Sequence, residues 1–381
     1  MNVELVNQVK EKFQEKFTSN PIVIFSPGRI NIIGEHTDYN DGFVFPAAVD
    51  KGIVAALGKA SDKECSIYAV NKYEPYTFSL DTVKPIENGG WRNYVLGVVG
   101  EIQKKGISLQ PFDIAFGGDI PGGAGMSSSA ALENSVVFGL NELFDLGLTK
   151  KEMILISQMA EHNYVGVKCG IMDQYASMFG VEDCALQLDC RTIESNPFKI
   201  DFQEYQLLLI NTNVKHSLND SAYNDRRSVC ENIASLLKVE ALRDVDESDL
   251  EKIKDQVSEE DYQKALYVIQ ENNRVIAASE AMEAGDLKML GQLLYGSHNG
   301  LQHQYQVSCE ELDFLVDKAK KYTDVLGARM MGGGFGGCTI NLIKKTAAHQ
   351  FKEEIAPAYR QEFNKDCSFY FVNLSDGTKR I

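Results

Sequence analysis

The chain has 381 residues, of which 44% are hydrophobic and 24% are charged. This length exceeds the size at which a single hydrophobic core usually stops growing, so we expect two packed domains. The 54 acidic and 38 basic side chains give a formal net charge of −16, which repels nucleic acids and anionic membrane surfaces. The composition therefore argues against both partners, and a bound anion must be held by local dipoles or a metal ion.

The eight cysteines are scattered, with no C-x-x-C pair and no partnered histidine spacing. This pattern predicts reduced thiols rather than a disulfide framework or a zinc site, and therefore a cytoplasmic protein. The N-terminus carries apolar residues at helical spacing among Lys and Glu, which is typical of an amphipathic helix and not of a signal peptide. No apolar run is long enough to cross a bilayer.

The first predicted strand, residues 22–25, leads into a stretch rich in polar chemistry. A turn does not need so many charged groups, and loops held by a rigid scaffold are where binding side chains tend to sit. A solvated loop is the alternative for any single residue, but the cluster as a whole favours a functional site. Its members are Arg29, Glu35, His36, Asp38 and Asp41, with Gly34 and Gly42.

Strand-like runs dominate the first third of the chain, and helical patterns come later. This order indicates an α+β domain with a mixed sheet. The only tryptophan, Trp91, is either a packing residue or a platform for a stacked base. The predicted strands are residues 42–49, 53–57, 67–70 and 112–116.

Residues 119–132 have the composition of a phosphate-binding loop that opens into a helix. Gly122, Gly123 and Gly125 permit backbone conformations in which successive N–H groups converge on one anion. The serines at 127–129 add hydroxyls where the helix begins, and a helix N-terminus attracts phosphate. The loop has no lysine, so it does not match the GxxxxGK[ST] pattern. A glycine-rich turn that caps an ordinary helix is the alternative.

A second helix is predicted from Lys150 to Val165, and Glu161 lies near its end. Asp173 follows, framed by Gly170 and apolar side chains. An aspartate in this setting is either a functional carboxylate or a buried acid satisfied by backbone N–H groups.

Near residue 180 the chain changes from strand-rich to helix-rich, so we predict domains at 1–180 and 181–381. Five glycines in the six positions 332–337 permit two backbones, or a backbone and a ligand, to approach closely. The last predicted strand is compatible with either domain. Predicted elements of the second domain are strands at 205–210, 338–343 and 369–372 and helices at 262–273, 277–284, 287–297 and 347–365.

Three separated motifs resemble those of the galactokinase family, within the GHMP small-molecule kinases. They are residues 27–40, 121–133 and 332–338, in the order that the family has them. The first is specific to galactokinases, and the other two mark the wider family. The likeness covers nearly the whole chain. It implies a two-domain GHMP kinase fold with mixed and antiparallel sheets and an active site in the cleft between the domains.

The resemblance implies transfer of the γ-phosphoryl group of ATP to the C1 hydroxyl of α-D-galactose, with Mg²⁺. Asp173 resembles the catalytic base, and Arg29 resembles the cation that stabilises the transferring charge. Ser129 and Glu161 resemble the Mg²⁺ ligands. The residues that resemble sugar contacts are Glu35, His36, Thr37, Asp38, Gly170 and Tyr223. Those that resemble ATP contacts are Trp91, Gly123, Ala124, Gly125, Met126, Ser127, Ser128 and Ser129.

Two alternatives remain open at the level of sequence. One is a kinase for N-acetylgalactosamine or another hexose on the same scaffold. The other is a sensor that binds galactose and ATP but has lost catalysis; such relatives lack the serine-alanine step that is present here at 129–130. We expect a cytoplasmic monomer whose partners are galactose and ATP, with no nucleic-acid or membrane partner.

Overall fold

The computed structural model describes the backbone of residues 1–214 and 219–381 and the side chains of all residues except 215–223. Its helices are α1 (Val3–Lys16), α2 (Trp91–Lys104), α3 (Ser128–Phe144), α4 (Lys150–Ala160), α5 (Met172–Phe179), α6 (Asn219–Leu237), α7 (Glu247–Glu251), α8 (Glu259–Glu283), α9 (Leu287–His303), α10 (Glu310–Lys320) and α11 (Ala348–Phe363). Its strands are β1 (Ile22–Asn31), β2 (Phe43–Val44), β3 (Pro46–Lys59), β4 (Cys65–Ala69), β5 (Glu74–Phe78), β6 (Phe112–Gly118), β7 (Cys184–Asp189), β8 (Glu194–Lys199), β9 (Tyr205–Asn211), β10 (Val325–Met331), β11 (Cys338–Lys344), β12 (Ser368–Phe371) and β13 (Lys379–Arg380).

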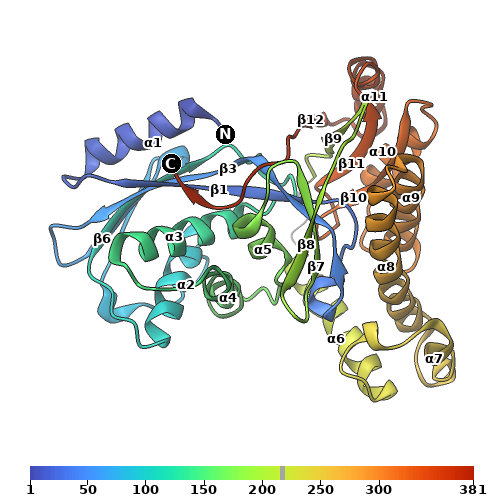
Figure 1. Ribbon diagram of the computed structural model, residues 1–381, viewed down its shortest axis with the longest axis horizontal. Coiled ribbons are helices and arrows are strands. Elements are labelled where there is room, and N and C mark those ends of the chain that lie inside the picture. The colour runs from blue at the N-terminus through green and yellow to red at the C-terminus, as the bar shows by residue number, and fades with distance from the viewer. Residues whose placement is uncertain (215–218) are drawn as a thin grey trace.

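A six-stranded mixed sheet organises the first half of the chain, in the order β13-β1-β3-β6-β4-β5. All of its strand pairs are antiparallel except β4 with β6. Helix α1 packs on one face against β3 and β6, and α3 packs on β1 and β3 from the other face, with α2 and α4 behind it (Figure 1). This arrangement confirms the predicted α+β class with a mixed sheet.

The second half is built on an antiparallel four-stranded sheet in the order β10-β11-β9-β12, against which α9 and α10 pack. Helices α8 and α9 lie side by side at the far end of the molecule from α1 (Figure 1). A three-stranded sheet, β2-β7-β8, lies between the two larger sheets. One hydrophobic cluster draws buried side chains from both halves, including Ile30, Phe45, Leu209 and Ile340, so the halves share a core.

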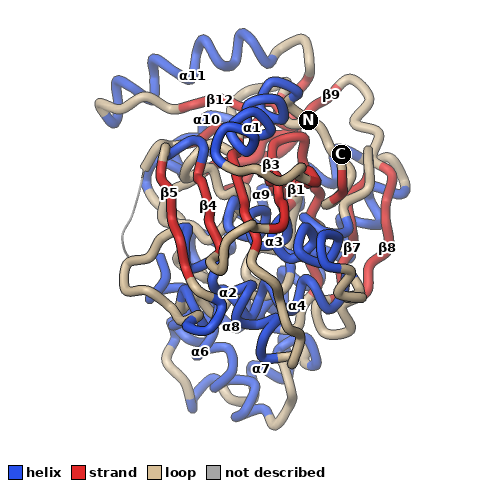
Figure 2. The backbone as a smooth tube through the Cα atoms, turned by 90° about the vertical axis from the view of Figure 1, so that its left-hand side faces the viewer, coloured by secondary structure: helices blue, strands red, loops and turns tan. Residues whose placement is uncertain are grey.

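The C-terminal end of the chain crosses between the two large sheets. Strand β12 pairs with β9 in the second sheet, and β13 then pairs with β1 in the first, with Arg380 opposite Ile24. The N- and C-termini therefore lie close together, as Figures 1 and 2 both show.

Some predicted boundaries differ from the structure. The two helices predicted at 262–273 and 277–284 are one continuous helix, α8, because the three residues between them, 274–276, include no glycine or proline to end it. The helix predicted at 150–165 is α4 followed by a π-helical turn, Glu161–Val165. The sequence patterns do not predict strands β5, β7, β8, β10 and β13. Among the described residues, no helix is both long and apolar enough to span a membrane.

The polar loop after β1 is held by the second half of the molecule. Glu271 on α8 is fully buried and its Oε1 accepts hydrogen bonds from the Gly34 backbone N–H, at 2.9 Å, and from the Ser297 hydroxyl. Gly34 has φ +98°, and a Cβ there would lie 2.7 Å from Val275 Cγ2 and 2.9 Å from the Phe43 carbonyl oxygen. The loop therefore depends on a glycine at this position.

We predict that Gly34→Ala lowers the free energy of unfolding by about 2–4 kcal/mol, because backbone strain at positive φ adds to overpacking. Gly106→Ala is the matched control: its φ is +79°, but a Cβ there has no atom within 4 Å. It should cost only about 1 kcal/mol. Urea unfolding followed by circular dichroism measures both, and equal midpoints for the two variants would contradict the prediction.

Candidate active site

Arg29 and Asp173, far apart in sequence, form an ion pair in the structure. Arg29 lies on β1 with 4% of its surface exposed, and Asp173 lies in the first turn of α5. Arg29 Nε donates to Asp173 Oδ1 at 2.8 Å, and Nη2 lies 2.7 Å from the same oxygen. Arg29 Nη1 donates to the Gly125 carbonyl oxygen at 2.5 Å. The guanidinium therefore joins the carboxylate to the glycine loop.

The second oxygen of Asp173 is held by Ser127. The Ser127 hydroxyl donates to Asp173 Oδ2 at 2.5 Å. Ser127 is the residue before α3, but it has φ +51° and its side chain does not cap the helix. The sequence places this serine at the start of a helix, but its hydroxyl donates to a carboxylate and does not cap the helix. A carboxylate has about four acceptor sites, and these contacts leave one site on Oδ2 for a ligand proton.

Asp173 lines an enclosed cavity of about 130 Å³, called here the Asp173 cavity. It lies between the halves of the molecule, because its wall includes residues on β1, on α5 and in the glycine-rich loop after β10. The structure brings together in it six of the residues singled out from the sequence. The lining residues are Arg29, Glu35, His36, Asp38, Glu161, Val167, Cys169, Met172, Asp173, Gly332 and Gly333.

Burial and neighbouring charges set the protonation of the cavity. Burial, and then the negative charges of Asp173 and Glu35, raise the pKa of Asp38 to about 7. Burial lowers the pKa of the His36 imidazole to about 3, so His36 is neutral at physiological pH. His36 Nδ1 lies 2.7 Å from the Tyr39 hydroxyl, which fixes the orientation of the ring. The cavity therefore offers both carboxylates and a neutral imidazole to a polyhydroxylated ligand.

Three predicted sugar contacts, Thr37, Gly170 and Tyr223, are not among the described residues that line the Asp173 cavity. The Thr37 hydroxyl is buried and bonds to the carbonyl oxygens of Gly34 and Phe43, at 2.9 and 2.7 Å, so it closes the loop and does not line the cavity. Gly170 packs against Asp38, since a Cβ there would lie 2.1 Å from Asp38 Oδ2. The side chain of Tyr223 lies outside the described residues.

A second cavity, of about 420 Å³ and called here the Trp91 cavity, adjoins the start of α3. Trp91 Nε1 donates to Glu74 Oε2 at 2.9 Å, so the indole is fixed at the edge of the first sheet. Sequence reasoning named Trp91, Ser128 and Ser129 as ligand contacts but not the other lining residues, which come from several strands, loops and helices; of these only Ile120 and Leu132 lie in the stretch 119–132. The other lining residues are Ile53, Ala69, Asn71, Lys72, Gly90, Tyr94, Phe116, Gly118, Ile120 and Leu132.

The glycine loop before α3 takes the conformation predicted for an anion cradle. Gly123 and Gly125 have φ +71° and +66°. A Cβ at Gly122 or Gly123 would meet no atom within 4 Å, so the loop faces open space. Ala124 and Met126 are each 1% exposed and pack in the core shared by the two halves. The side chains of these two residues are therefore not available to a phosphate.

The loop at 332–337 lies at the Asp173 cavity and against the glycine loop before α3. Gly332 and Gly333 line the Asp173 cavity. A Cβ on Gly125 would lie 3.2 Å from the Met331 carbonyl oxygen, and one on Gly337 would lie 3.6 Å from that of Gly123. The loop therefore packs closely against a second backbone, which is one of the two roles that the sequence left open. It also lines the Asp173 cavity.

The two predicted metal ligands line different cavities, and the described residues hold no cluster of three or more His, Cys, Asp or Glu side chains that could bind a metal ion. Glu161 is in the π-helical turn after α4, 7% exposed, and lines the Asp173 cavity, whereas Ser129 lines the Trp91 cavity. Glu133 lies one helical turn after Ser129 and is fully buried. Burial, and then the charge of Glu161, raise the pKa of Glu133. These are hard oxygen donors, the type that Mg²⁺ prefers.

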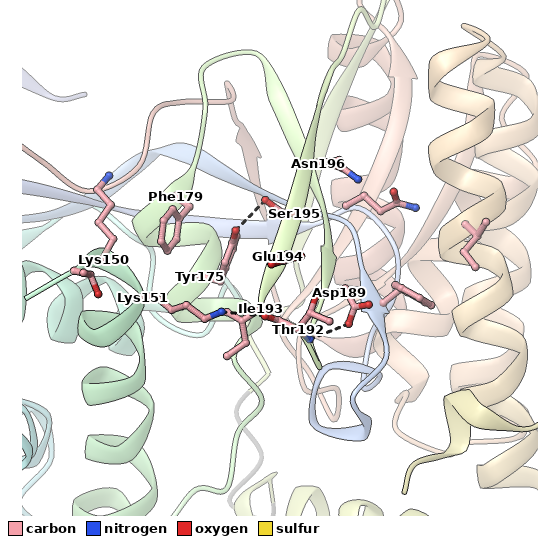
Figure 3. A pocket seen from close by; sticks show the side chains of 14 residues that line it. Lys150, Lys151, Tyr175, Phe179, Asp189, Thr192, Ile193, Glu194, Ser195 and Asn196 are labelled. Atoms are coloured by element: carbon pink, nitrogen blue, oxygen red, sulfur yellow. Dashed lines mark hydrogen bonds between the residues drawn. The ribbon is translucent and has the colours of Figure 1, made fainter. Parts of the chain in front are cut away.

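A larger hollow, of about 1070 Å³, lies elsewhere, between α4, α5 and the β7–β8 hairpin (Figure 3). Its polar groups are largely satisfied within the protein. Lys151 Nζ donates to the Thr192 carbonyl oxygen, the Tyr175 hydroxyl donates to Ser195, and Asp189 is paired with Arg243. Size alone therefore does not mark the reactive site; convergent charge does.

Comparison with known proteins agrees with this geometry. Residues 11–59 match the galactokinase galactose-binding signature, 93–181 the N-terminal domain of GHMP kinases and 278–361 their C-terminal domain. The galactokinase of Clostridium acetobutylicum is 38% identical over the whole of both chains, and that of Thermotoga petrophila is 40% identical over 93% of this chain and 99% of its own.

Solved structures give the same result. The structure of Lactococcus lactis galactokinase complexed with galactose superposes with a TM-score of 0.94, at 34% identity, over 98% of this chain and 99% of that one. Mevalonate kinase from Methanococcus jannaschii, at 17% identity and a TM-score of 0.68 over 94% of this chain and all of its own, shares the fold. The chain therefore belongs to the galactokinase family, the ATP-dependent sugar kinases of the GHMP group.

Proposed function

We propose that Asp173 and Arg29 carry the transfer of the ATP γ-phosphoryl group to the C1 hydroxyl of α-D-galactose, the reaction of the family to which the chain belongs. The observation that supports this most directly is the Arg29–Asp173 ion pair, which faces the Asp173 cavity on one side and the glycine loop on the other. An acceptor hydroxyl and a phosphate thus meet at one point, as phosphoryl transfer requires.

In this proposal the free acceptor site on Asp173 Oδ2 takes the proton of the sugar C1 hydroxyl. The C1 oxygen forms its bond to the γ-phosphorus, the bond from phosphorus to the β,γ-bridging oxygen breaks, and ADP leaves. Arg29 stabilises negative charge on the transferring group while it holds the carboxylate in place. Ser127 fixes the orientation of Asp173, so the reacting oxygen is presented in one direction.

The nucleotide lies, in our proposal, with its base in the Trp91 cavity and its phosphates on the loop at 123–129. The backbone N–H groups and the N-terminus of α3 supply the positive potential that a chain of net charge −16 lacks elsewhere. Ser129 and Glu161 would hold Mg²⁺, and the buried carboxyl of Glu133 beside them has an oxygen, Oε1, with no hydrogen-bond partner among the described residues. A bound Mg²⁺ would neutralise charge on the β- and γ-phosphates.

The sugar lies in the Asp173 cavity, against Glu35, His36 and Asp38. We assign galactose rather than N-acetylgalactosamine, because residues 11–59 match the galactose-binding signature of galactokinases. The relative complexed with galactose supports the same choice. The sensor alternative has no support here, because the ion pair and the serine contact that catalysis needs are all formed.

We also propose a cytoplasmic monomer divided near residue 180. The eight cysteines are all free thiols, which fits a reducing compartment. Separate hydrophobic clusters, one on each large sheet, support the division, with β13 added to the first sheet and one cluster shared between the halves.

We predict that the protein transfers phosphate from ATP to galactose in preference to N-acetylgalactosamine, glucose and mevalonate, measured by ADP release. Asp173→Asn should lower kcat by about 10²–10⁴-fold, because the proton acceptor is lost. Galactose binding measured by calorimetry should change less than about threefold, since the amide keeps the shape of the carboxylate.

Asp50→Asn is the control for that variant, because its carboxylate lies outside both cavities and bonds to Asn373. It should keep the activity of the parent protein. An Asp173→Asn protein with parental turnover would remove the base assignment, and a preference for another sugar would remove the substrate assignment.

A second prediction concerns Ser127. We expect Ser127→Gly to lower kcat by about 10–100-fold, the value of one hydrogen bond to a charged group. Glycine also accepts the positive φ at this position, so the variant removes the hydroxyl without adding strain. Steady-state kinetics against the parent measure the loss. Unchanged kcat at full folding would show that Asp173 does not need this contact.

A third prediction follows from the pKa of Asp38. Below pH 7 this carboxyl is protonated and loses acceptor capacity, so galactose binding should weaken as pH falls through about 7, by up to about tenfold per unit. Calorimetry without nucleotide, from pH 5.5 to 8.5, measures this. Asp38→Asn should bind weakly and without this pH dependence. A wild-type affinity that does not change with pH would contradict the assignment.

A further inference from the structure

Arg329 on β10 is a fully buried arginine that lines neither cavity. Its guanidinium donates to three backbone carbonyl oxygens: Nε to Ile32 at 2.7 Å, Nη1 to Met330 at 2.5 Å, and Nη2 to Asn31. Both Nη atoms also lie 3.2 Å from Glu35 Oε1. An arginine with this many partners is fixed in one orientation.

The two oxygens of Glu35 are used differently. Oε1 accepts from Arg329 and from the Gly332 backbone N–H, at 2.8 Å. Oε2 accepts one hydrogen bond from the described residues, that of the Asn31 side-chain amide at 3.2 Å. Oε1 thus has three donors and Oε2 has one, so Oε2 keeps acceptor capacity for a ligand hydroxyl, and Glu35 lines the Asp173 cavity.

We propose that Arg329 is a positioning residue for sugar recognition, which by holding Oε1 of Glu35 aims Oε2 at one hydroxyl of the bound sugar. This inference rests on the proposed place of the sugar in the Asp173 cavity. The terminal side-chain torsion of a glutamate has no sharply preferred value. Without the two N–H groups of Arg329 on Oε1, the plane of the carboxylate is therefore held less firmly. Glu35 is 2% exposed, so water does not replace the lost contact.

Lysine cannot replace Arg329 in this role. An ammonium keeps the positive charge but lacks the planar fork that contacts one carboxylate oxygen with two N–H groups while reaching three carbonyls. Arg329→Lys therefore keeps the positive charge of the side chain and removes its planar geometry. Arg191→Lys is the matched control, because Arg191 makes a bidentate pair with Asp244, at 2.8 and 2.6 Å, away from both cavities.

The test measures calorimetric dissociation constants for galactose and its 2-, 3-, 4- and 6-deoxy analogues. The proteins are the parent, Glu35→Gln, Arg329→Lys and Arg191→Lys. In the parent, one deoxy analogue should bind about tenfold or more weaker than galactose, since a hydroxyl on a carboxylate is lost. Glu35→Gln and Arg329→Lys should both lose the discrimination against that same analogue. The affinity for a non-hydrolysable ATP analogue should stay within about threefold, and Arg191→Lys should behave as the parent.

Other results overturn the inference. Arg329→Lys could weaken the binding of all five sugars by one common factor, which indicates a general structural role. It could also keep the parental discrimination between galactose and the deoxy analogue. If it does not fold by circular dichroism, Arg329→Gln takes its place, and failure of both makes Arg329 a folding determinant instead. If Glu35→Gln keeps the parental discrimination, Glu35 is not the sugar contact, while galactose phosphorylation by the parent still stands as a separate test of the proposed reaction.

Discussion

The structure depends on one ion pair, between Arg29 and Asp173. A guanidinium that is 4% exposed needs a nearby carboxylate, because an unpaired charge in that position would be costly. Burial opposes the charge of Arg29, but Asp173, Glu35 and Asp38 outweigh it and raise the pKa of Arg29. The pairing brings β1, α5 and the glycine loop together at one point. The same contact that satisfies a buried charge therefore also assembles the groups that phosphoryl transfer needs.

The glycine-rich loop after β10 connects the two ligand sites. Its first residue donates to Glu35 at the Asp173 cavity, and its backbone lies against that of the glycine loop before α3. The closest approach is at Gly125, where a Cβ would lie 3.2 Å from the Met331 carbonyl oxygen and φ is +66°, so a glycine suits this position best. The second half of the molecule thus contributes to the site mainly through backbone and through the buried Arg329, rather than through residues that sequence patterns mark as reactive.

The positive potential that the proposed nucleotide site needs is opposite in sign to the net charge of the protein. The surface is strongly acidic, yet the substrate of the family carries a triphosphate. Local dipoles at the start of α3, the guanidinium of Arg29 and the proposed Mg²⁺ offset this field at short range, where an enclosed site screens charges weakly. Glu35 and Asp38 line the Asp173 cavity, where we propose that the neutral sugar binds, and carboxylates are good acceptors for its hydroxyls.

The sequence by itself determined the fold class, the glycine loop with its positive φ angles, and the family, because these depend on local residue types and on motifs that stand in order along the chain. Only the tertiary structure decided how side chains are used. Ser127 is at a helix start but bonds to Asp173, Thr37 closes its own loop, and Arg329 sits in a strand that sequence did not predict. The partners of Ser127 and Arg329 are distant in sequence, and a pattern read along one chain carries no information about which distant groups meet; the partners of Thr37 are near in sequence, but the composition of the loop does not show that they bond.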